Sequence, residues 1–192
     1  YGYCRIFKKA TRNYKNERNQ ILIYFLRHFK VKDNSKSWLN SEEFNQWVKS
    51  YDTFELEYNS VVLPKNIDKI YVSSQNRAIK SADFLNLNYK INDLLVEVPI
   101  KSFIYTKFKL PKWLWLFVGR LAWFFNLKQL ETKEETNERI ENFIQNLDIN
   151  SNILIISHGF FMILLLKKLK KIGYRGDIRR RIGNGKVYIL EK

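Results

Sequence analysis

The sequence predicts an α/β domain, a three-layer α/β/α sandwich in which helices cover both faces of a mostly parallel sheet. Three apolar runs that lack helical spacing, at residues 21–26, 69–72 and 153–157, are typical of buried strands. Segments whose apolar residues recur at helical spacing lie between these runs and after the last one. Strands that alternate with helices along a chain form a parallel sheet covered by helices, and this alternation decides the fold class.

Capping and turn residues mark the ends of the predicted elements. Residues 40–43 contain a capping box that opens the first helix, and residues 132–135 contain a second one. Ser74 is placed to cap the helix between them. The glycine-rich turn at residues 183–185 leads into a last strand at 186–190.

The composition indicates one folded domain. The 192 residues are 45% hydrophobic and 16% aromatic, which is enough to bury a core. Cys4 is the only cysteine, so an intramolecular disulfide is excluded and a reducing compartment is expected. The first 20 residues contain no apolar core long enough for a signal peptide. We therefore expect a cytoplasmic protein.

The net charge of +15 is concentrated in two clusters. Residues 1–20 contain six Lys or Arg and one Glu, and residues 167–181 contain eight Lys or Arg and one Asp. Such clusters attract phosphorylated substrates, nucleic acid or an anionic membrane, although solvated basic ends are the favoured interpretation. We divide the chain into a basic N-terminal segment at 1–20 and a domain at 21–192, and we expect no specific nucleic-acid partner.

Both histidines of the chain follow predicted strands. His28 stands after the first apolar run, in Arg27-His28, and His158 stands directly after the last run. Arg77 follows the remaining run, in the first turn of a predicted helix, where unpaired backbone N–H groups favour an anion. Open α/β sheets bind ligands at the carboxyl ends of their strands. The four side chains therefore predict one shared site.

Three motifs surround these residues, and they are Leu26-Arg27-His28, Ser73-Ser74 with Arg77-Ala78, and Ser157-His158-Gly159. In this order they resemble the Arg-His-Gly signature, the Ser-Ser-x-x-x-Arg-Ala segment and the second histidine motif of the histidine phosphatase superfamily. That family has the phosphoglycerate-mutase-like fold, and the resemblance spans residues 21–190 and indicates its small bacterial-type phosphatase branch. The sequence departs from the family at Phe29, where glycine is usual, and we expect this ring at the mouth of the cleft.

The resemblance implies a role for each of the four side chains. His28 would be the nucleophile that forms a covalent phosphohistidine, because a neutral imidazole can attack phosphorus. Arg27, Arg77 and His158 would bind the phosphoryl group, and His158 would carry positive charge near it. Phosphoryl transfer needs positioning and stabilisation of charge, which planar, permanently charged guanidinium groups provide.

Two further candidates come from the same resemblance. Glu97 lies twenty residues after Arg77, where the family usually has its general acid, which would protonate the leaving alkoxide and then deprotonate the attacking water. From the residues alone, Glu97 lies either on the exposed face of an edge strand or in a cleft. Asn34 lies seven residues after Arg27, where many members have an asparagine that binds the phosphoryl group. Two histidines without clustered carboxylates or cysteines are a poor ligand set, so no metal or other cofactor is expected.

Residues 110–127 are apolar on nearly all sides and contain three of the five tryptophans. The segment is short for a membrane span, and Gly119-Arg120 interrupts it. One interpretation is a helix that lies in a membrane interface. The other, which we favour, is a helical insertion that covers the sheet and roofs the cleft. In the family this region forms a variable helical cap, so we assign a cap insertion to residues 100–130.

Together these observations predict a phosphatase that acts on a small phosphorylated substrate. A phosphomutase of the same superfamily is a second interpretation, although the chain lacks the long insertions of the larger mutases. A third is a non-catalytic member that binds a membrane or nucleic acid through its basic ends and aromatic segment. The presence of both histidines, both arginines and Glu97 disfavours that third interpretation.

Overall fold

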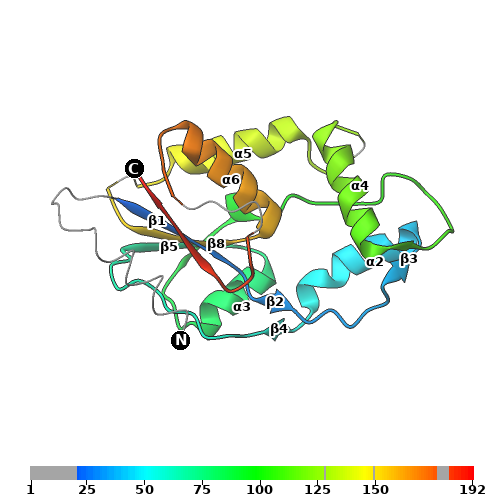
Figure 1. The fold of residues 1–192 in the computed structure, drawn as a ribbon, viewed down its shortest axis with the longest axis horizontal. Coiled ribbons are helices and arrows are strands. Elements are labelled where there is room, and N and C mark those ends of the chain that lie inside the picture. The colour runs from blue at the N-terminus through cyan, green and yellow to red at the C-terminus, as the bar shows by residue number, and fades with distance from the viewer. Residues whose placement is uncertain (1–20, 128, 149, 177–181) are drawn as a thin grey trace.

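The computed structural model describes residues 21–127, 129–148, 150–176 and 182–192. Its centre is a five-stranded sheet with the order β6-β5-β8-β1-β9 (Figure 1). The strands are β1 (Leu22–Arg27), β5 (Lys69–Ser73), β6 (Lys90–Asn92), β8 (Ile153–Ser157) and β9 (Val187–Glu191). β6, β5, β8 and β1 run parallel, and β9 is an antiparallel edge strand. The predicted α/β fold with a mostly parallel sheet is confirmed.

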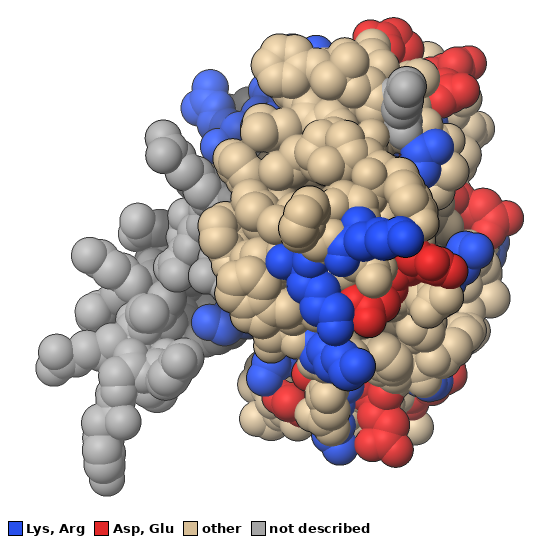
Figure 2. All heavy atoms as spheres, turned by 90° about the vertical axis from the view of Figure 1, so that its right-hand side faces the viewer, with Lys and Arg blue, Asp and Glu red and all other residues tan. Residues whose placement is uncertain are grey.

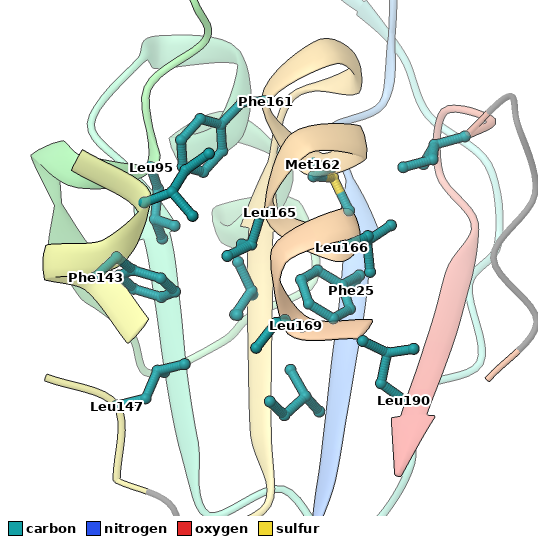
Figure 3. Packing of buried hydrophobic residues seen from close by; sticks show 14 of the residues in the cluster. Phe25, Leu95, Phe143, Leu147, Phe161, Met162, Leu165, Leu166, Leu169 and Leu190 are labelled. Carbon is teal, nitrogen blue, oxygen red and sulfur yellow. The ribbon is translucent and has the colours of Figure 1, made fainter. Parts of the chain in front are cut away.

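Helices cover both faces of this sheet because successive strand residues point to opposite sides. On one face, α5 (Lys133–Gln145) and α6 (Gly159–Lys171) pack over Phe25 and Ile155. Figure 3 shows the row of apolar α6 side chains, from Phe161 to Leu169, above the strands. On the other face, the alanines of α3 (Asn76–Phe84) pack against the intervening β1 and β8 residues. The core of the domain therefore has two halves, one on each side of the sheet.

The predicted capping boxes are confirmed, but the predicted cap of α3 is wrong. α2 (Ser41–Ser50) begins with the Asn40 box and α5 with the Thr132 box. At α3 the N-cap is Gln75, and the carboxylate of Asp52 accepts hydrogen bonds from the backbone N–H groups of residues 76 and 77. A carboxylate has two acceptor oxygens and a charge that favours a helix N-terminus, so it satisfies more of these donors than the hydroxyl of Ser74.

A smaller region beside the sheet contains α2 and α4 (Lys112–Phe124) (Figure 1). Its remaining elements are two strand pairs, β2 (Lys30–Val31) with β4 (Leu56–Glu57) and β3 (Trp38–Leu39) with β7 (Leu110–Pro111), and the short 3-10 helix η1 (Tyr51–Thr53). A second 3-10 helix, η2 (Asp93–Leu95), follows β6 and packs against β5 and α5 in the core of the sheet. The helix expected within residues 110–127 is thus present. None of the helices in the described part of the chain is long and apolar enough to cross a membrane.

The proposed N-terminal basic segment, 1–20, lies outside the described residues, as do residues 177–181 of the second basic cluster.

Candidate active site

The two histidines meet because their strands are neighbours in the sheet. β1 and β8 are parallel and in register, with Arg27 opposite Ser157. The chain stays paired one residue further, since the backbone N–H of His28 donates to the Ser157 carbonyl at 3.1 Å. The rings of His28 and His158 lie 5.2 Å apart between centroids, and both are buried. The structure therefore brings together the two strand-end histidines that the sequence singles out.

The hydrogen bond of His28 defines its tautomer. Nδ1 lies 2.6 Å from the carbonyl oxygen of Phe29. A carbonyl can only accept, so Nδ1 carries the proton and Nε2 keeps its lone pair. Burial, together with the charges of Arg77 and Arg27, lowers the pKa of His28 to about 3. At neutral pH this side chain is an uncharged imidazole with an available nitrogen, which is the form that a nucleophile requires.

Arg27 reaches the site across the start of α6. Its Nη1 donates to the carbonyl of Ile182 at 2.8 Å. A Cβ at Gly159 would lie 2.8 Å from Cζ of Arg27, so no larger residue fits there without moving the guanidinium group. The glycine after His158 therefore gives Arg27 room to pass over the helix start.

Arg77 is buried in the first turn of α3, where two side chains hold it. Its Nη1 donates to Oδ1 of Asp52 at 2.8 Å, and its Nη2 donates to Oε1 of Gln75 at 2.9 Å. Asp52 also caps α3, so a single carboxylate fixes both the helix and the arginine. Nε of Arg77 is buried and has no hydrogen-bond partner among the described residues. A buried donor of this kind suits an anionic ligand.

The ring of His158 lies between the ring of His28 and Ser73, at the carboxyl end of β5. Its Nε2 shares a hydrogen bond of 2.7 Å with Oγ of Ser73, while its Nδ1 is buried without a hydrogen-bond partner in the described part of the chain. Burial is the main cause that lowers the pKa of His158 well below its ordinary value. The charges of Arg77, His28, Arg27 and Arg139 lower it further. In the free protein His158 is therefore neutral, which differs from the positive charge expected of it. Its cationic surroundings oppose protonation.

Glu97 lies at the N-terminus of α6, next to His158 in the fold. Its Oε2 accepts from the backbone N–H of Phe160 at 3.1 Å and its Oε1 from that of Phe161 at 2.9 Å. The backbone N–H of Glu97 donates to Oε1 of Gln75, the same atom that holds Arg77. Residues 96–100 have no regular secondary structure, so the edge-strand alternative for Glu97 is wrong. Gln75, which sequence reasoning missed, joins the acid candidate to the arginine.

Asn34 is exposed in the loop between β2 and β3. Its neighbour Asp33 is engaged by Lys112 and Trp47, at 2.6 Å and 3.1 Å. No hydrogen bond between described residues joins Asn34 to the histidines or arginines, so its role in binding phosphate stays a prediction.

Phe29 does not lie at the mouth of the cleft, and that expectation is wrong. Its ring is fully buried and makes edge-to-face contacts with Tyr58 and Phe84, each at 5.3 Å between centroids. His28 turns toward the site, and Phe29 turns into a separate apolar cluster with Val31 and Leu56.

Within the described residues, no three His, Cys, Asp or Glu side chains lie close enough to hold a metal ion. A hollow of about 560 Å³ adjoins Arg27 and is also lined by Lys30, Asn184 and Lys186. A second hollow of about 560 Å³ lies between α2 and residues 101–105, away from the histidines.

A sequence comparison finds that the model of the histidine phosphatase superfamily (branch 1) matches residues 60–192, which is 133 of 192 residues. The match includes Arg77, Glu97 and His158 and begins after His28. No curated protein matches the chain.

Solved structures with similar folds extend the resemblance over more of the chain. One is TTHB049 from Thermus thermophilus, which is 14% identical, with 88% of this chain and 92% of that chain covered and a TM-score of 0.53. Another is the mycobacterial glucosyl-3-phosphoglycerate phosphatase, at 15% identity, 90% and 90% coverage and a TM-score of 0.51. A third is the alpha-ribazole phosphatase from Shigella flexneri, at 17% identity, 88% and 89% coverage and a TM-score of 0.50. At these identities the matches show a shared fold.

Proposed function

This chain belongs to the histidine phosphatase superfamily, and from that premise we propose that it hydrolyses a phosphomonoester through a covalent phosphohistidine on His28. The observation that carries the proposal is the neutral His28, with its lone pair on Nε2, buried beside His158 in the field of two arginines. Two cationic groups near a neutral nucleophile suit an anionic electrophile such as a phosphoryl group.

In the first step, Nε2 of His28 attacks phosphorus while the bond to the leaving oxygen breaks. Arg27 and Arg77 bind the equatorial oxygens, on which negative charge accumulates. The unpartnered Nε of Arg77 and Nδ1 of His158 are further polar atoms suited to those oxygens. Glu97 gives its proton to the leaving alkoxide.

In the second step, water attacks the phosphohistidine, and the N–P bond breaks to return neutral His28. Glu97, now ionised, takes a proton from that water, as the reversal of its first role requires. The hydrogen bonds from the start of α6 support the ionised carboxylate at this stage. Phosphate then leaves, and the site returns to its starting state.

The proposal is tested by release of inorganic phosphate from p-nitrophenyl phosphate and from a panel of phosphorylated metabolites. Arg77→Ala should lower kcat/KM by about 100- to 1,000-fold, the cost of removing one preorganised donor from a developing oxyanion. Arg175→Ala, which removes an exposed arginine elsewhere, is the matched control and should leave activity unchanged. Equal effects of the two variants, or phosphate returned to the substrate with none released, would contradict a phosphatase.

A further inference from the structure

Helix α4 has an exposed face that is entirely apolar. Trp115, Gly119, Ala122 and Trp123 are buried on its inner side. The exposed residues of the helix form a stripe, and they are Trp113, Phe117, Leu121 and Phe124. At 3.6 residues per turn these four positions fall within an arc of about 80°, and Trp113 is 67% exposed. We call this stripe, with the exposed Phe125 that follows it, the aromatic face.

The aromatic face is held outward by the packing of the opposite side of the helix. Trp115 donates from Nε1 to the carbonyl of Leu39 at 2.8 Å and stacks on Phe44 at 5.4 Å between centroids. At the other end of α4, Trp123 donates from Nε1 to Oγ1 of Thr136. Because these buried contacts fix the rotation of the helix, its exposed rings are part of the folded surface.

The surroundings of the aromatic face are basic. Residues 101–130 contain six Lys or Arg and no Asp or Glu; two of the six, Lys112 and Arg120, pair with Asp33 and Glu97. Lys107 and Lys109 are exposed on either side of Phe108, which is itself 83% exposed, and Nζ of Lys133 lies 4.8 Å from the centre of the Phe124 ring. This loop and α4 lie at the same end of the molecule (Figure 1). Figure 2 views that end, where uncharged residues cover most of the surface and a band of Lys and Arg crosses it, with acidic side chains next to the band.

The next carboxylates along the chain are already engaged. Glu131 is held by Arg139 through several hydrogen bonds, and Glu134 accepts one from Asn126. The charge of Glu131 is thus balanced by Arg139, whereas Glu134 keeps its negative charge.

From this combination we infer that α4 docks the protein on an anionic phospholipid surface. Contiguous exposed apolar patches mark interaction sites, and protein interfaces are depleted in lysine, whereas Lys133 lies against the aromatic face at Phe124 and two more exposed lysines lie in the loop at the same end of the molecule. An apolar stripe of Trp, Phe and Leu flanked by Lys is the composition of helices that lie in a membrane interface. The rings enter the boundary between headgroups and acyl chains, and the ammonium groups of Lys107, Lys109 and Lys133 bind lipid phosphates. Lys109 exchanges its contact with Glu43, at 3.9 Å, for a lipid phosphate. The helix lies in the plane of the membrane.

Vesicle flotation tests the inference with the full chain. Vesicles of phosphatidylcholine containing phosphatidylglycerol should carry the protein upward, and vesicles of phosphatidylcholine alone should carry much less. Raising the salt concentration should weaken binding without abolishing it. Salt screens the attraction between the lysines and the lipid phosphates, but it does not weaken the insertion of the aromatic rings into the membrane. No flotation with the anionic vesicles at low salt would overturn the inference.

The aromatic face is tested by the triple variant Trp113→Ser, Phe117→Ser, Phe124→Ser. Its affinity for the anionic vesicles should fall by at least about tenfold, since burial of even one aromatic side chain is worth that much. The matched control is Val62→Ser with Ile91→Ser, two exposed apolar residues elsewhere in the fold, which should bind as wild type does. Circular dichroism and thermal unfolding establish that each variant is folded. Unchanged binding by a folded triple variant would contradict the role of α4.

The lysines are tested by the pair Lys107→Glu, Lys109→Glu against the pair Lys80→Glu, Lys90→Glu, which changes the net charge equally at exposed positions on α3 and β6. The first pair should weaken binding more than the second. Equal losses would show attraction by net charge alone and overturn the docking orientation. Sedimentation of the wild type supplies the last outcome, because an oligomer that the triple variant dissociates would assign the aromatic face to a second copy of the chain.

Discussion

The strand-end site and the aromatic face of α4 are both exceptions to the rule that polar side chains are exposed and apolar side chains are buried, and they are opposite exceptions. At the strand ends, the polar side chains of His28, His158 and Arg77 are buried. On α4, large apolar side chains such as Trp113 and Phe117 are exposed. Both arrangements cost stability in an isolated protein, and each becomes favourable when the right ligand is present. The first suits an anion, and the second suits an apolar interface.

The strand-end site and α4 meet at Glu97, and the substitution with the largest expected effect is at this residue. Nη2 of Arg120 on α4 lies 3.9 Å from Oε1 of Glu97, which also caps α6 beside His158. If Glu97 is the general acid, Glu97→Gln should lose about 100- to 10,000-fold in rate on an alkyl phosphate. The loss on p-nitrophenyl phosphate should be far smaller, because nitrophenolate leaves without much help from an acid.

The measurement for Glu97 is a stopped-flow burst on each substrate, which isolates formation of the phosphohistidine. The control is thermal unfolding, because glutamine keeps only one of the two oxygens that accept from α6. Equal losses on the two substrates would assign Glu97 to capping alone and leave the site without its proposed acid.

Two tryptophans two residues apart on α4 sharpen the contrast between its buried and exposed faces. Trp115 is 1% exposed and stacks on Phe44, whereas Trp113 is 67% exposed. Trp115→Ala should lower the free energy of unfolding by about 3–5 kcal/mol, as expected for loss of a large core ring. Trp113→Ala should change it by less than about 0.5 kcal/mol. Urea unfolding of both variants tests this, and similar losses would show that the aromatic face is part of the core.

Asp52 tests how the buried charge of Arg77 is maintained. Asp52→Ala removes the cap of α3 and the partner of Arg77 together, so we expect the free energy of unfolding to fall by about 1–2 kcal/mol. KM should rise as well, because Arg77 loses its anchor. Asp52→Asn keeps an oxygen that can cap the helix, so it should recover most of the stability. An Ala variant with wild-type stability and kinetics would show that Gln75 alone positions the arginine.

The buried histidines predict a pH dependence of stability. His28 has its pKa lowered from 6.5 to about 3 in the folded protein, and the pKa of His158 is lowered in the same direction. The unfolded chain therefore binds more protons than the folded one between these values. The stabilisation by His28 is complete above pH 6.5 and is lost as the pH falls toward 3, by about 1.4 kcal/mol per pH unit. The lowered pKa of His158 adds a loss in the same direction. In denaturant titrations, His28→Gln should lose stability less steeply than wild type below pH 6.5, and equal slopes would contradict the buried neutral state.

Local patterns in the sequence predict the sheet and the pairing of its two histidines. Unbroken apolar runs mark strands that are buried on both faces, and the carboxyl ends of parallel neighbours meet at one edge. That is sufficient to predict that His28 and His158 lie together. The capping boxes of α2 and α5 are equally predictable, because all their hydrogen bonds fall within four residues.

Contacts between distant segments account for what the sequence does not predict. Asp52 reaches Arg77 across 25 residues, and no local pattern marks a lone aspartate in a 3-10 turn as a helix cap. The same holds for Gln75, whose importance depends on the tertiary position of Glu97. The prediction for Phe29 is wrong because the family comparison concerns the size of the residue at this position and does not give the direction of its side chain, which packs against Val31 and Leu56. The sequence does not predict that Trp113 is exposed either. A helix that is apolar on all sides has no pattern that distinguishes its buried face from its exposed face.

The central claim, that His28 becomes phosphorylated, is tested most directly by trapping the intermediate. Wild-type protein mixed briefly with a labelled phosphoester and quenched in alkali should retain acid-labile label on the peptide that contains His28. His28→Ala should show no label, and His28→Gln, whose side chain is closer in size, serves as a second variant if alanine impairs folding. Label that persists in a folded variant, or turnover within tenfold of wild type, would contradict the assignment of His28 as the nucleophile.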